Sequence, residues 1–172
     1  MKEITITKIS IADIHQLQKI GKETFFETFF ESNSEENMRL YLEKEFSIEK
    51  LTSEILNPDT SFYFAKSTHE VIGYLKLNSG NSQTELNDNN ALEIQRIYVL
   101  KDYHGKKVGQ MLYDKAIAQA KQMNLDYVWL GVWEENPRAI AFYKKNGFVE
   151  FDKHIFKLGD DEQIDIMMKL NL

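Results

Sequence analysis

The sequence of 172 residues contains no cysteine. This absence excludes thiol nucleophiles, thiolate metal sites and disulfide bonds, and it fits a reducing compartment. There are only two prolines, so no proline-rich linker divides the chain. No segment approaches the roughly 20 consecutive apolar residues of a transmembrane helix, and the first ten residues, MKEITITKIS, lack the apolar run of a signal peptide. We therefore expect a cytoplasmic protein without a membrane anchor.

Positive charge is scarce, because 21 Lys and Arg residues stand against 27 Asp and Glu residues and give a net charge of −6. An acidic surface repels phosphates, so nucleic acid is not an expected partner. The same surface would suit a cationic substrate, although acidic charge also serves solubility alone. Hydrophobic residues make up 42% of the chain, which is ordinary for a globular protein. A chain of 172 residues is also long enough to bury a core without metals or disulfides. We expect residues 1–172 to form a single domain that needs no metal.

Hydrophobic periodicity predicts a chain that begins with mostly helical segments and then alternates strands with helices. Apolar residues return at helical spacing from Ile11 to Phe30, and two shorter helices begin near Ser34 and Ser47. The predicted strands are residues 3–9, 61–67, 71–78, 91–100, 126–133, 148–158 and 163–170. Two later helices begin at Val108 and behind a cap at Asn136. This order indicates an α/β (α+β) fold, a mixed sheet covered on both faces.

The segment YHGKKVGQML, residues 103–112, places two glycines and two lysines between a predicted strand and a predicted helix. The free N–H groups and positive dipole end of a helix start bind phosphate, and glycine lets the backbone approach a ligand closely. The spacing fits neither the GxxxxGK[ST] loop nor the GxGxxG loop of nucleotide-binding proteins, since Gly105 and Gly109 lie four residues apart. The segment is therefore either an ordinary turn or a phosphate site of another kind.

A second segment follows about two dozen residues later: WLGVWEENPRAIAFYKKNGF combines a strand, an acidic turn and a short helix. RIYV at 96–99, HGKKVG at 104–109 and NPRAIAFYKKNGF at 136–148 together resemble the GNAT acetyltransferase superfamily. The third block matches that pattern at every defining position, but His104 replaces Gln or Arg and Lys107 replaces a glycine. ETFFETFFESNSEENMRLYLE, LEIQRIYV and GDDEQIDIMM extend the resemblance to bacterial spermidine/spermine N-acetyltransferases of the PaiA type.

This resemblance implies a GNAT fold: a mixed, mostly antiparallel sheet of about seven strands, splayed at its centre, with helices on both faces. It also implies acetyl-CoA as co-substrate, with its pantetheine along the strand that ends at Val99 and its pyrophosphate on N–H groups of the glycine loop. Lys107 keeps such a donor, but a non-glycine residue with positive φ costs about 1–2 kcal/mol. The ring of His104 can still donate to a phosphate. The expected acetyl-CoA-binding residues are Ile97, Tyr98, Val99, His104, Gly105, Lys106, Lys107, Val108, Gly109, Gln110, Asn136, Tyr143 and Lys145.

The resemblance assigns two residues to catalysis. Tyr143 falls on the family's general-acid position, beside the departing thiolate, and the alternative is an ordinary core tyrosine. Glu93 falls on a strand position where related enzymes place a carboxylate that deprotonates the acceptor, directly or through water. For Glu93 the alternative is an ion pair with a neighbouring Lys or Arg. Strict alternation would place Gln95 and Ile97 on the same face as Glu93.

A small-molecule amine is the implied partner, and a polyamine ranks ahead of a protein N-terminus or another small amine. Transfer would be direct within a ternary complex, since no cysteine is available to form an acyl-enzyme. The competing function is a CoA-binding regulatory module without turnover, which would not need the Glu93–Tyr143 pair. Carboxylates that could hold a polyamine are Glu27, Glu31, Glu134 and Glu135. The aromatic residues expected in the core, one of which could line the acceptor channel, are Phe25, Phe26, Phe29 and Phe30.

Overall fold

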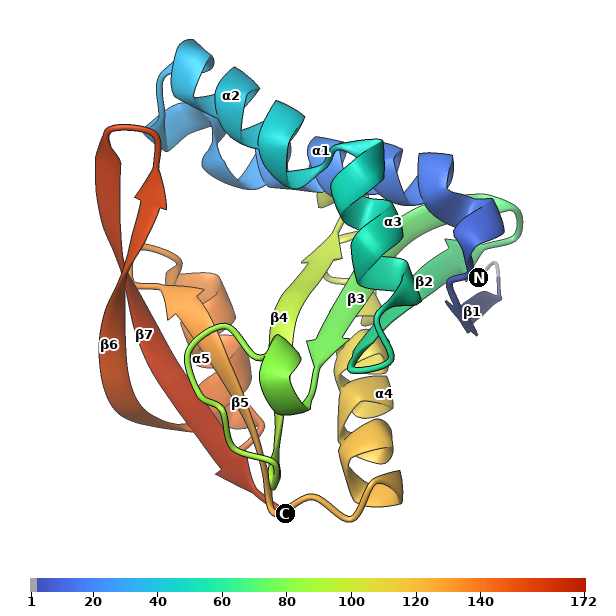
Figure 1. The fold of residues 1–172 in the computed structure, drawn as a ribbon, viewed down its shortest axis with the longest axis vertical. Helices are drawn as coiled ribbons and strands as arrows, with labels where there is room; N and C mark the ends of the chain where they lie inside the picture. Colours follow the sequence, from blue (N-terminus) through green and yellow to red (C-terminus); the bar gives the residue numbers. More distant parts are fainter. Residues whose placement is uncertain (1–2) are drawn as a thin grey trace.

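One sheet of seven strands runs through the computed structural model, which describes residues 3–172 (Figure 1). The strands are β1 (Ile4–Lys8), β2 (Thr60–Ser67), β3 (Glu70–Asn78), β4 (Ala91–Val99), β5 (Tyr127–Trp133), β6 (Val149–Leu158) and β7 (Asp161–Asn171). Their spatial order is β1-β2-β3-β4-β5-β7-β6, and only the β4–β5 pair is parallel. The predicted mixed, mostly antiparallel sheet is therefore confirmed.

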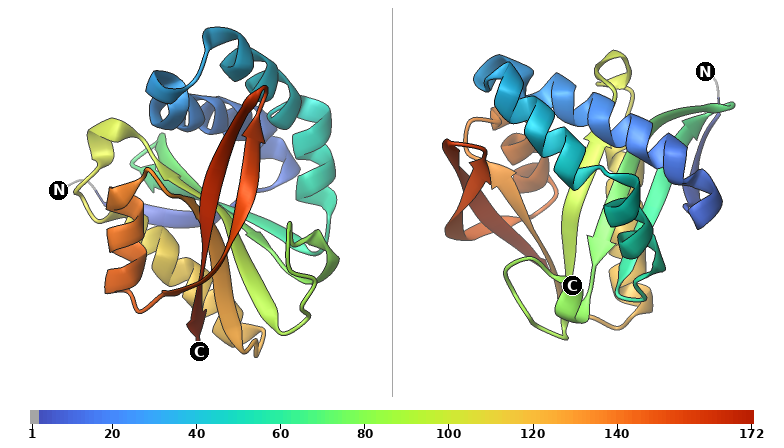
Figure 2. Two further views of the ribbon diagram at one scale, coloured as in Figure 1. Left: turned by 90° about the vertical axis from the view of Figure 1, so that its left-hand side faces the viewer. Right: turned by 45° about the horizontal axis from the view of Figure 1, so that its top comes forward.

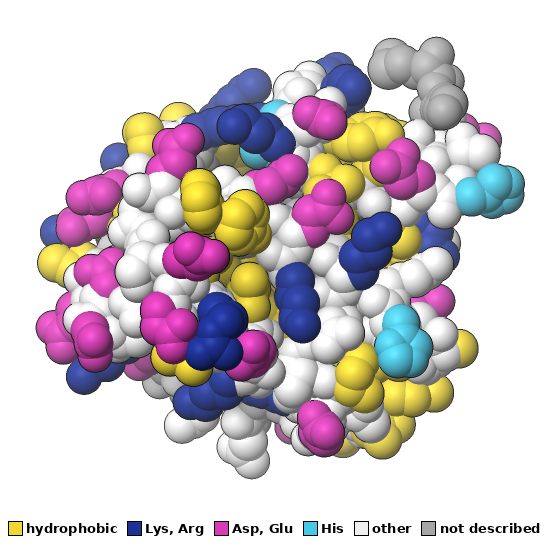
Figure 3. All heavy atoms as spheres, turned by 90° about the horizontal axis from the view of Figure 1, so that it is seen from above, with side chains coloured by type: hydrophobic (Ala, Val, Ile, Leu, Met, Phe, Trp, Pro, Cys, Tyr) yellow, Lys and Arg dark blue, Asp and Glu magenta, His cyan; other side chains and the backbone are white. Residues whose placement is uncertain are grey.

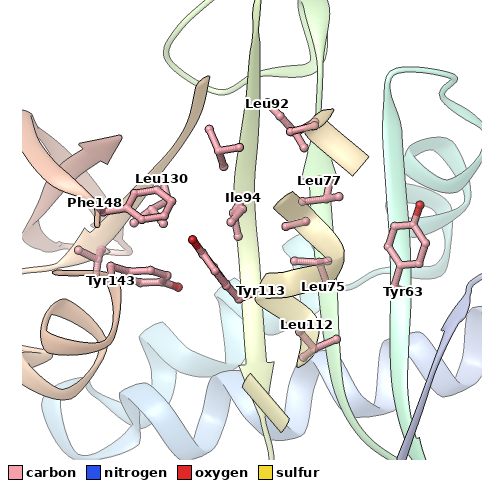
Figure 4. Packing of buried hydrophobic residues seen from close by; sticks show 14 of the residues in the cluster. Tyr63, Leu75, Leu77, Leu92, Ile94, Leu112, Tyr113, Leu130, Tyr143 and Phe148 are labelled. Atoms are coloured by element: carbon pink, nitrogen blue, oxygen red, sulfur yellow. The ribbon is translucent and has the colours of Figure 1, made fainter. Parts of the chain in front are cut away.

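Helices cover both faces of this sheet (Figures 1 and 2). They are α1 (Ile14–Phe29), α2 (Glu35–Glu45), α3 (Ile48–Leu56), α4 (Val108–Gln122) and α5 (Pro137–Lys145). The first three pack with Phe62, Phe64 and Tyr74 on what we term the α1 face. The last two pack with Leu75 and Leu77 on the opposite α4 face, shown in Figure 4. Within residues 3–172, none of these helices is long and apolar enough to cross a bilayer.

Local sequence signals set the ends of several helices. The Asn136 side chain accepts a hydrogen bond from the main-chain N–H three residues on, and Pro137 occupies the first helical position of α5. Gly147 follows that helix with φ of 92°, a conformation that glycine adopts without steric cost. Ser34 and Ser47 cap α2 and α3 in the same manner. The helix starts predicted at these positions are confirmed.

The sheet splays at its centre, between β4 and β5. The two strands pair only at Ala91–Tyr127, Leu92–Val128 and Glu93–Trp129. Beyond that point β5 stays with β7 and β4 stays with β3. Because the two strands separate, the facing edge of β4 keeps main-chain groups that β5 does not pair.

A β-bulge in β4 resets the direction of its side chains. Its register against β3 passes from Ile94 to Arg96, which leaves Gln95 as an extra residue. Consequently Ile94 and Ile97 both pack on the α4 face, whereas Glu93 points to the α1 face. The prediction that Glu93, Gln95 and Ile97 share one face is wrong for Ile97, since strict alternation does not survive a bulge. It holds for Glu93 and Gln95, whose side chains both accept a hydrogen bond from the Asn78 amide.

The four phenylalanines at the end of α1 and in the turn that follows it divide between core and surface. Phe25 and Phe29 are buried, whereas Phe26 and Phe30 are 44% and 49% exposed and pack on each other, with ring centroids 4.5 Å apart. The helical repeat explains this division, because neighbouring residues point about 100° apart. The prediction of a core position therefore holds for two of the four. Figure 3 views the molecule from above Figure 1 and shows exposed hydrophobic side chains scattered among charged ones.

Candidate active site

A cleft of about 600 Å³ opens at the splay, bordered by the free part of β4, the starts of α4 and α5, and one side of α1. Every residue expected to bind acetyl-CoA lines this cleft except Lys106. The Lys106 ammonium instead lies over the ring of Tyr103, 4.7 Å from its centroid. Residues that are distant in sequence, from β4 through α5, are thus brought together by the opening of the sheet.

The start of α4 offers main-chain donors to the cleft. The first hydrogen bond of this helix runs from the Met111 N–H to the Lys107 carbonyl oxygen, at 3.1 Å. The N–H groups from Lys107 to Gln110 therefore have no partner inside the helix. A Cβ atom placed on Gly105 or Gly109 would meet no other atom within 4 Å, so the space in front of both glycines is open. Free donors, open space and the positive helix end together fit an anionic group such as a pyrophosphate.

Lys107 occupies a left-handed backbone conformation, with φ of 64° and ψ of 10°. This is the conformation that disfavours any residue with a Cβ atom, by about 1–2 kcal/mol. The lysine at this position is therefore strained, although its main-chain N–H remains available at the helix start.

We expect Lys107→Gly to raise the free energy of unfolding by up to about 1 kcal/mol, since glycine removes the strain but adds flexibility to the unfolded chain. Urea denaturation of both proteins without ligand measures this difference. Lys106→Gly is the matched control, because Lys106 does not have positive φ and should gain nothing. Equal stability of Lys107→Gly and Lys106→Gly would contradict the assignment of strain to position 107.

Both ring nitrogens of His104 are engaged, and one of them binds an arginine that lines the cleft. Its Nε2 lies 2.8 Å from the Val99 carbonyl oxygen, and its Nδ1 accepts a hydrogen bond from the Arg138 guanidinium. The donation to phosphate predicted for the His104 ring is not available while both nitrogens are so engaged. Arg138 lines the cleft and brings a planar fork of donors suited to phosphate. Sequence analysis missed it because the family block leaves this position unspecified.

Tyr143 lies on α5, where its ring packs against Phe142 and Phe148 and is 6% exposed. Its side chain reaches from α5 toward Tyr113 (Figure 4) and lines the cleft. Burial is the cause that raises the pKa of the hydroxyl above its ordinary value. Within residues 3–172 no hydrogen bond engages this hydroxyl, so its proton is free to be donated into the cleft.

Glu93 does not reach the cleft. Its side chain is buried, and its oxygens accept hydrogen bonds from the Thr84 N–H at 2.9 Å, the Thr84 hydroxyl at 2.5 Å and the Asn78 amide at 3.0 Å. The expected access to the acceptor amine is therefore absent, and the partners are neutral groups rather than the Lys or Arg of the alternative. Its place along β4 explains this, because Glu93 is the last residue of the strand that pairs with β5, before the cleft opens, and Thr84 of the preceding loop covers its carboxylate.

Two of the four carboxylates considered for amine binding line the cleft, namely Glu27 and Glu135. The Glu27 carboxylate also accepts a hydrogen bond from the Lys101 N–H at 2.9 Å, which ties α1 to the end of β4. Glu31 and Glu134 do not line it. Among residues 3–172, no group of three or more His, Asp or Glu side chains is arranged to hold a metal ion.

Comparison with known proteins identifies the fold and its family. The profile of the acetyltransferase (GNAT) family matches residues 14–148, which include the whole cleft from α1 to α5. The chain belongs to this family. It is an N-acetyltransferase that uses acetyl-CoA as co-substrate, and the free donors, open glycines and arginine of the cleft fit that molecule.

Three relatives illustrate the similarity. An uncharacterised N-acetyltransferase of Lactobacillus delbrueckii subsp. lactis is 40% identical over 169 residues, 98% of each chain. A protein named spermidine N(1)-acetyltransferase, from Thermoplasma acidophilum, is 29% identical over 96% of each chain. The crystal structure of the PaiA N-acetyltransferase from Thermoplasma acidophilum in complex with coenzyme A superposes with a TM-score of 0.82 at 28% identity, covering 99% of both chains. These proteins match the acetyltransferase over nearly its full length.

Proposed function

We propose that this acetyltransferase acetylates a primary amine of a polyamine such as spermidine or spermine. The observation that carries the proposal is the mixed charge of the cleft, where the cations Lys107 and Arg138 share the lining with the carboxylates Glu27 and Glu135. Cations suit the phosphates of acetyl-CoA, and carboxylates suit an acceptor with several ammonium groups. The net charge of −6 and the similarity to a spermidine N(1)-acetyltransferase support the same acceptor.

Acetyl-CoA supplies the acetyl group as a thioester, and residues of the cleft would hold it. The N–H groups from Lys107 to Gln110 and the Arg138 guanidinium would bind its phosphates. The main-chain groups of β4 at Ile97, which β5 leaves unpaired, would form hydrogen bonds with the amide groups of its pantetheine arm. The binding energy would then fix the donor in the cleft beside Tyr143.

Tyr143 would donate a hydrogen bond to the departing sulfur. The raised pKa of this tyrosine keeps the hydroxyl protonated at neutral pH, whereas a free thiol has a pKa near 8.5. Complete proton transfer to the sulfur is therefore less favourable than donation of a hydrogen bond, which stabilises the thiolate as the carbon–sulfur bond breaks. The acceptor amine would attack directly, because the sequence has no cysteine to carry an acetyl group.

A thiol-release assay with acetyl-CoA tests the proposal against a panel of spermidine, spermine, single amino acids and a short peptide. We expect kcat/KM for spermidine to exceed that for the peptide at least 10-fold, equivalent to about 1.4 kcal/mol of transition-state binding. The reverse ranking would make a protein N-terminus the acceptor. Absence of release with every amine, together with tight CoA binding by calorimetry, would support the CoA-binding module instead.

A further inference from the structure

A hollow lies in the middle of β5 on the α1 face. Gly131 is exposed there, although its neighbours Leu130 and Val132 are buried on the α4 face. A Cβ atom on Gly131 would lie 3.3 Å from Cε1 of His154 and 3.4 Å from Oδ2 of Asp165. The hollow is therefore the solvent-exposed surface of Gly131, with an imidazole and a carboxylate next to the position that a side chain would take.

This hollow adjoins the acetyl-CoA cleft. Asp165 of β7 pairs with Trp133 of β5, and Trp133 lines the cleft. The charge of Asp165 also acts on Tyr98 of β4, which lines the cleft from the opposite strand of the splay. The carboxylate thus lies where the two strands separate, on the face opposite α5 and Tyr143.

The carboxylate of Asp165 is enclosed but not neutralised by a close cation. Its side chain is 17% exposed, and Nε2 of His154 on β6 is 3.9 Å away. That nitrogen is also 3.7 Å from Oε1 of Glu85 in the loop between β3 and β4, and the charge of Asp165 acts on Tyr41 of α2 as well. Burial raises the pKa of Asp165, while His154 acts in the lowering direction. No hydrogen bond within residues 3–172 occupies its oxygens, and the buried Nδ1 of His154 also lacks a partner.

We propose that the acceptor amine enters the hollow over Gly131 and that Asp165 is the catalytic residue that binds its ammonium group and takes its proton. This assignment rests on the proposed function. It gives Asp165 the role of proton acceptor that Glu93, which does not reach the cleft, cannot fill. In the step, one N–H proton passes to the Asp165 carboxylate, and the freed nitrogen lone pair bonds to the thioester carbonyl carbon. The carbon–sulfur bond breaks and its electron pair leaves on the sulfur, which accepts a hydrogen bond from Tyr143. The second proton, which the nitrogen must lose to become an amide, passes to this thiolate and gives the free thiol of coenzyme A.

Asp165→Asn tests the assignment through the pH profile of kcat/KM for spermidine. We expect at least a 100-fold loss at pH 7, since a positioned base contributes about 100-fold or more. Without the carboxylate only the free amine can react, so kcat/KM of the variant should rise about tenfold per pH unit between pH 7 and 9. The wild-type profile should be nearly flat over that range. Parallel profiles in the two proteins would overturn the assignment.

The matched control is Glu162→Gln, which removes a negative charge from an exposed position on the same strand, where Glu162 pairs with Lys157 at 3.5 Å. Its profile should match the wild type. Asp165→Asn should remain folded and no less stable at pH 7, because burial disfavours the charge that it removes. The sign follows from linkage: a carboxyl whose native pKa is raised stabilises the fold below its unfolded pKa and loses that contribution as pH rises through the native pKa.

Calorimetric titration of spermidine into the CoA-bound protein separates this inference from the proposed function. We expect Kd to increase at least 10-fold in Asp165→Asn, and also in Gly131→Ala, whose methyl group would occupy the hollow beside His154 and Asp165 without removing a charge. If the wild type releases no thiol with any amine, the proposed function fails, and these affinities still decide whether the hollow binds amines. Equal Kd values for the wild type and both variants would overturn the site.

Discussion

Tyr143→Phe should lower kcat by about 100-fold, the smallest effect typical of a lost acid–base group. The substitution removes only the hydroxyl and keeps the ring that packs against Phe142 and Phe148. Because the phosphate-binding groups at the start of α4 are untouched, the Kd for CoA should stay within about threefold, or about 0.6 kcal/mol. Steady-state thiol release and CoA titration measure the two quantities.

Tyr113→Phe provides the control for this substitution. Tyr113 is as buried as Tyr143 and meets Phe142 edge to face at 5.8 Å, but it lies on α4 and does not line the cleft. Loss of its hydroxyl should leave kcat within about threefold of the wild type. A threefold change corresponds to about 0.6 kcal/mol, which is the size of an indirect effect through packing. Similar kcat values for Tyr143→Phe and the wild type would remove Tyr143 from the mechanism.

Glu93→Ala should lower the free energy of unfolding by about 3 kcal/mol, because it leaves buried donors unpaired and opens a cavity. The donors are the amide of Asn78 and the N–H of Thr84, which hold the loop before β4 against the strand. Urea denaturation followed by circular dichroism gives the difference.

The same variant separates a structural role of Glu93 from a catalytic one. At a temperature where it is fully folded, Glu93→Ala should keep kcat within about tenfold of the wild type, since a lost base costs about 100-fold or more. Glu93→Gln preserves shape and should lose less stability than alanine. Unchanged stability combined with a 100-fold loss of kcat would show that Glu93 takes part in the mechanism. That result would contradict the structural role inferred from the hydrogen bonds to its oxygens.

The order of strands and helices, the family blocks and most of the cleft lining could be predicted from the sequence. These features depend on residues that are close together in the chain. The side chains of Ser34 and Asn136 cap N–H groups three residues on, and the spacing of hydrophobic residues shows whether one segment is a helix or a strand. The residues from Lys107 to Gln110 begin α4 because a strand end and a glycine turn precede them. Even the strain at Lys107 was expected, since the family pattern has glycine at that position.

Only the tertiary structure decided which acidic and basic groups lie at the cleft and at the hollow beside it. The bulge at Gln95 exists through the register of β4 on β3 and places Ile97 on the α4 face, while the β4–β5 pairing and the contact with Thr84 keep Glu93 out of the cleft. Arg138 reaches the cleft through His104, 34 positions earlier in the chain, and Asp165 reaches the hollow over Gly131 through the pairing of β7 with β5. A sequence pattern records the spacing of residues along one chain segment, whereas these contacts join separate segments across the sheet.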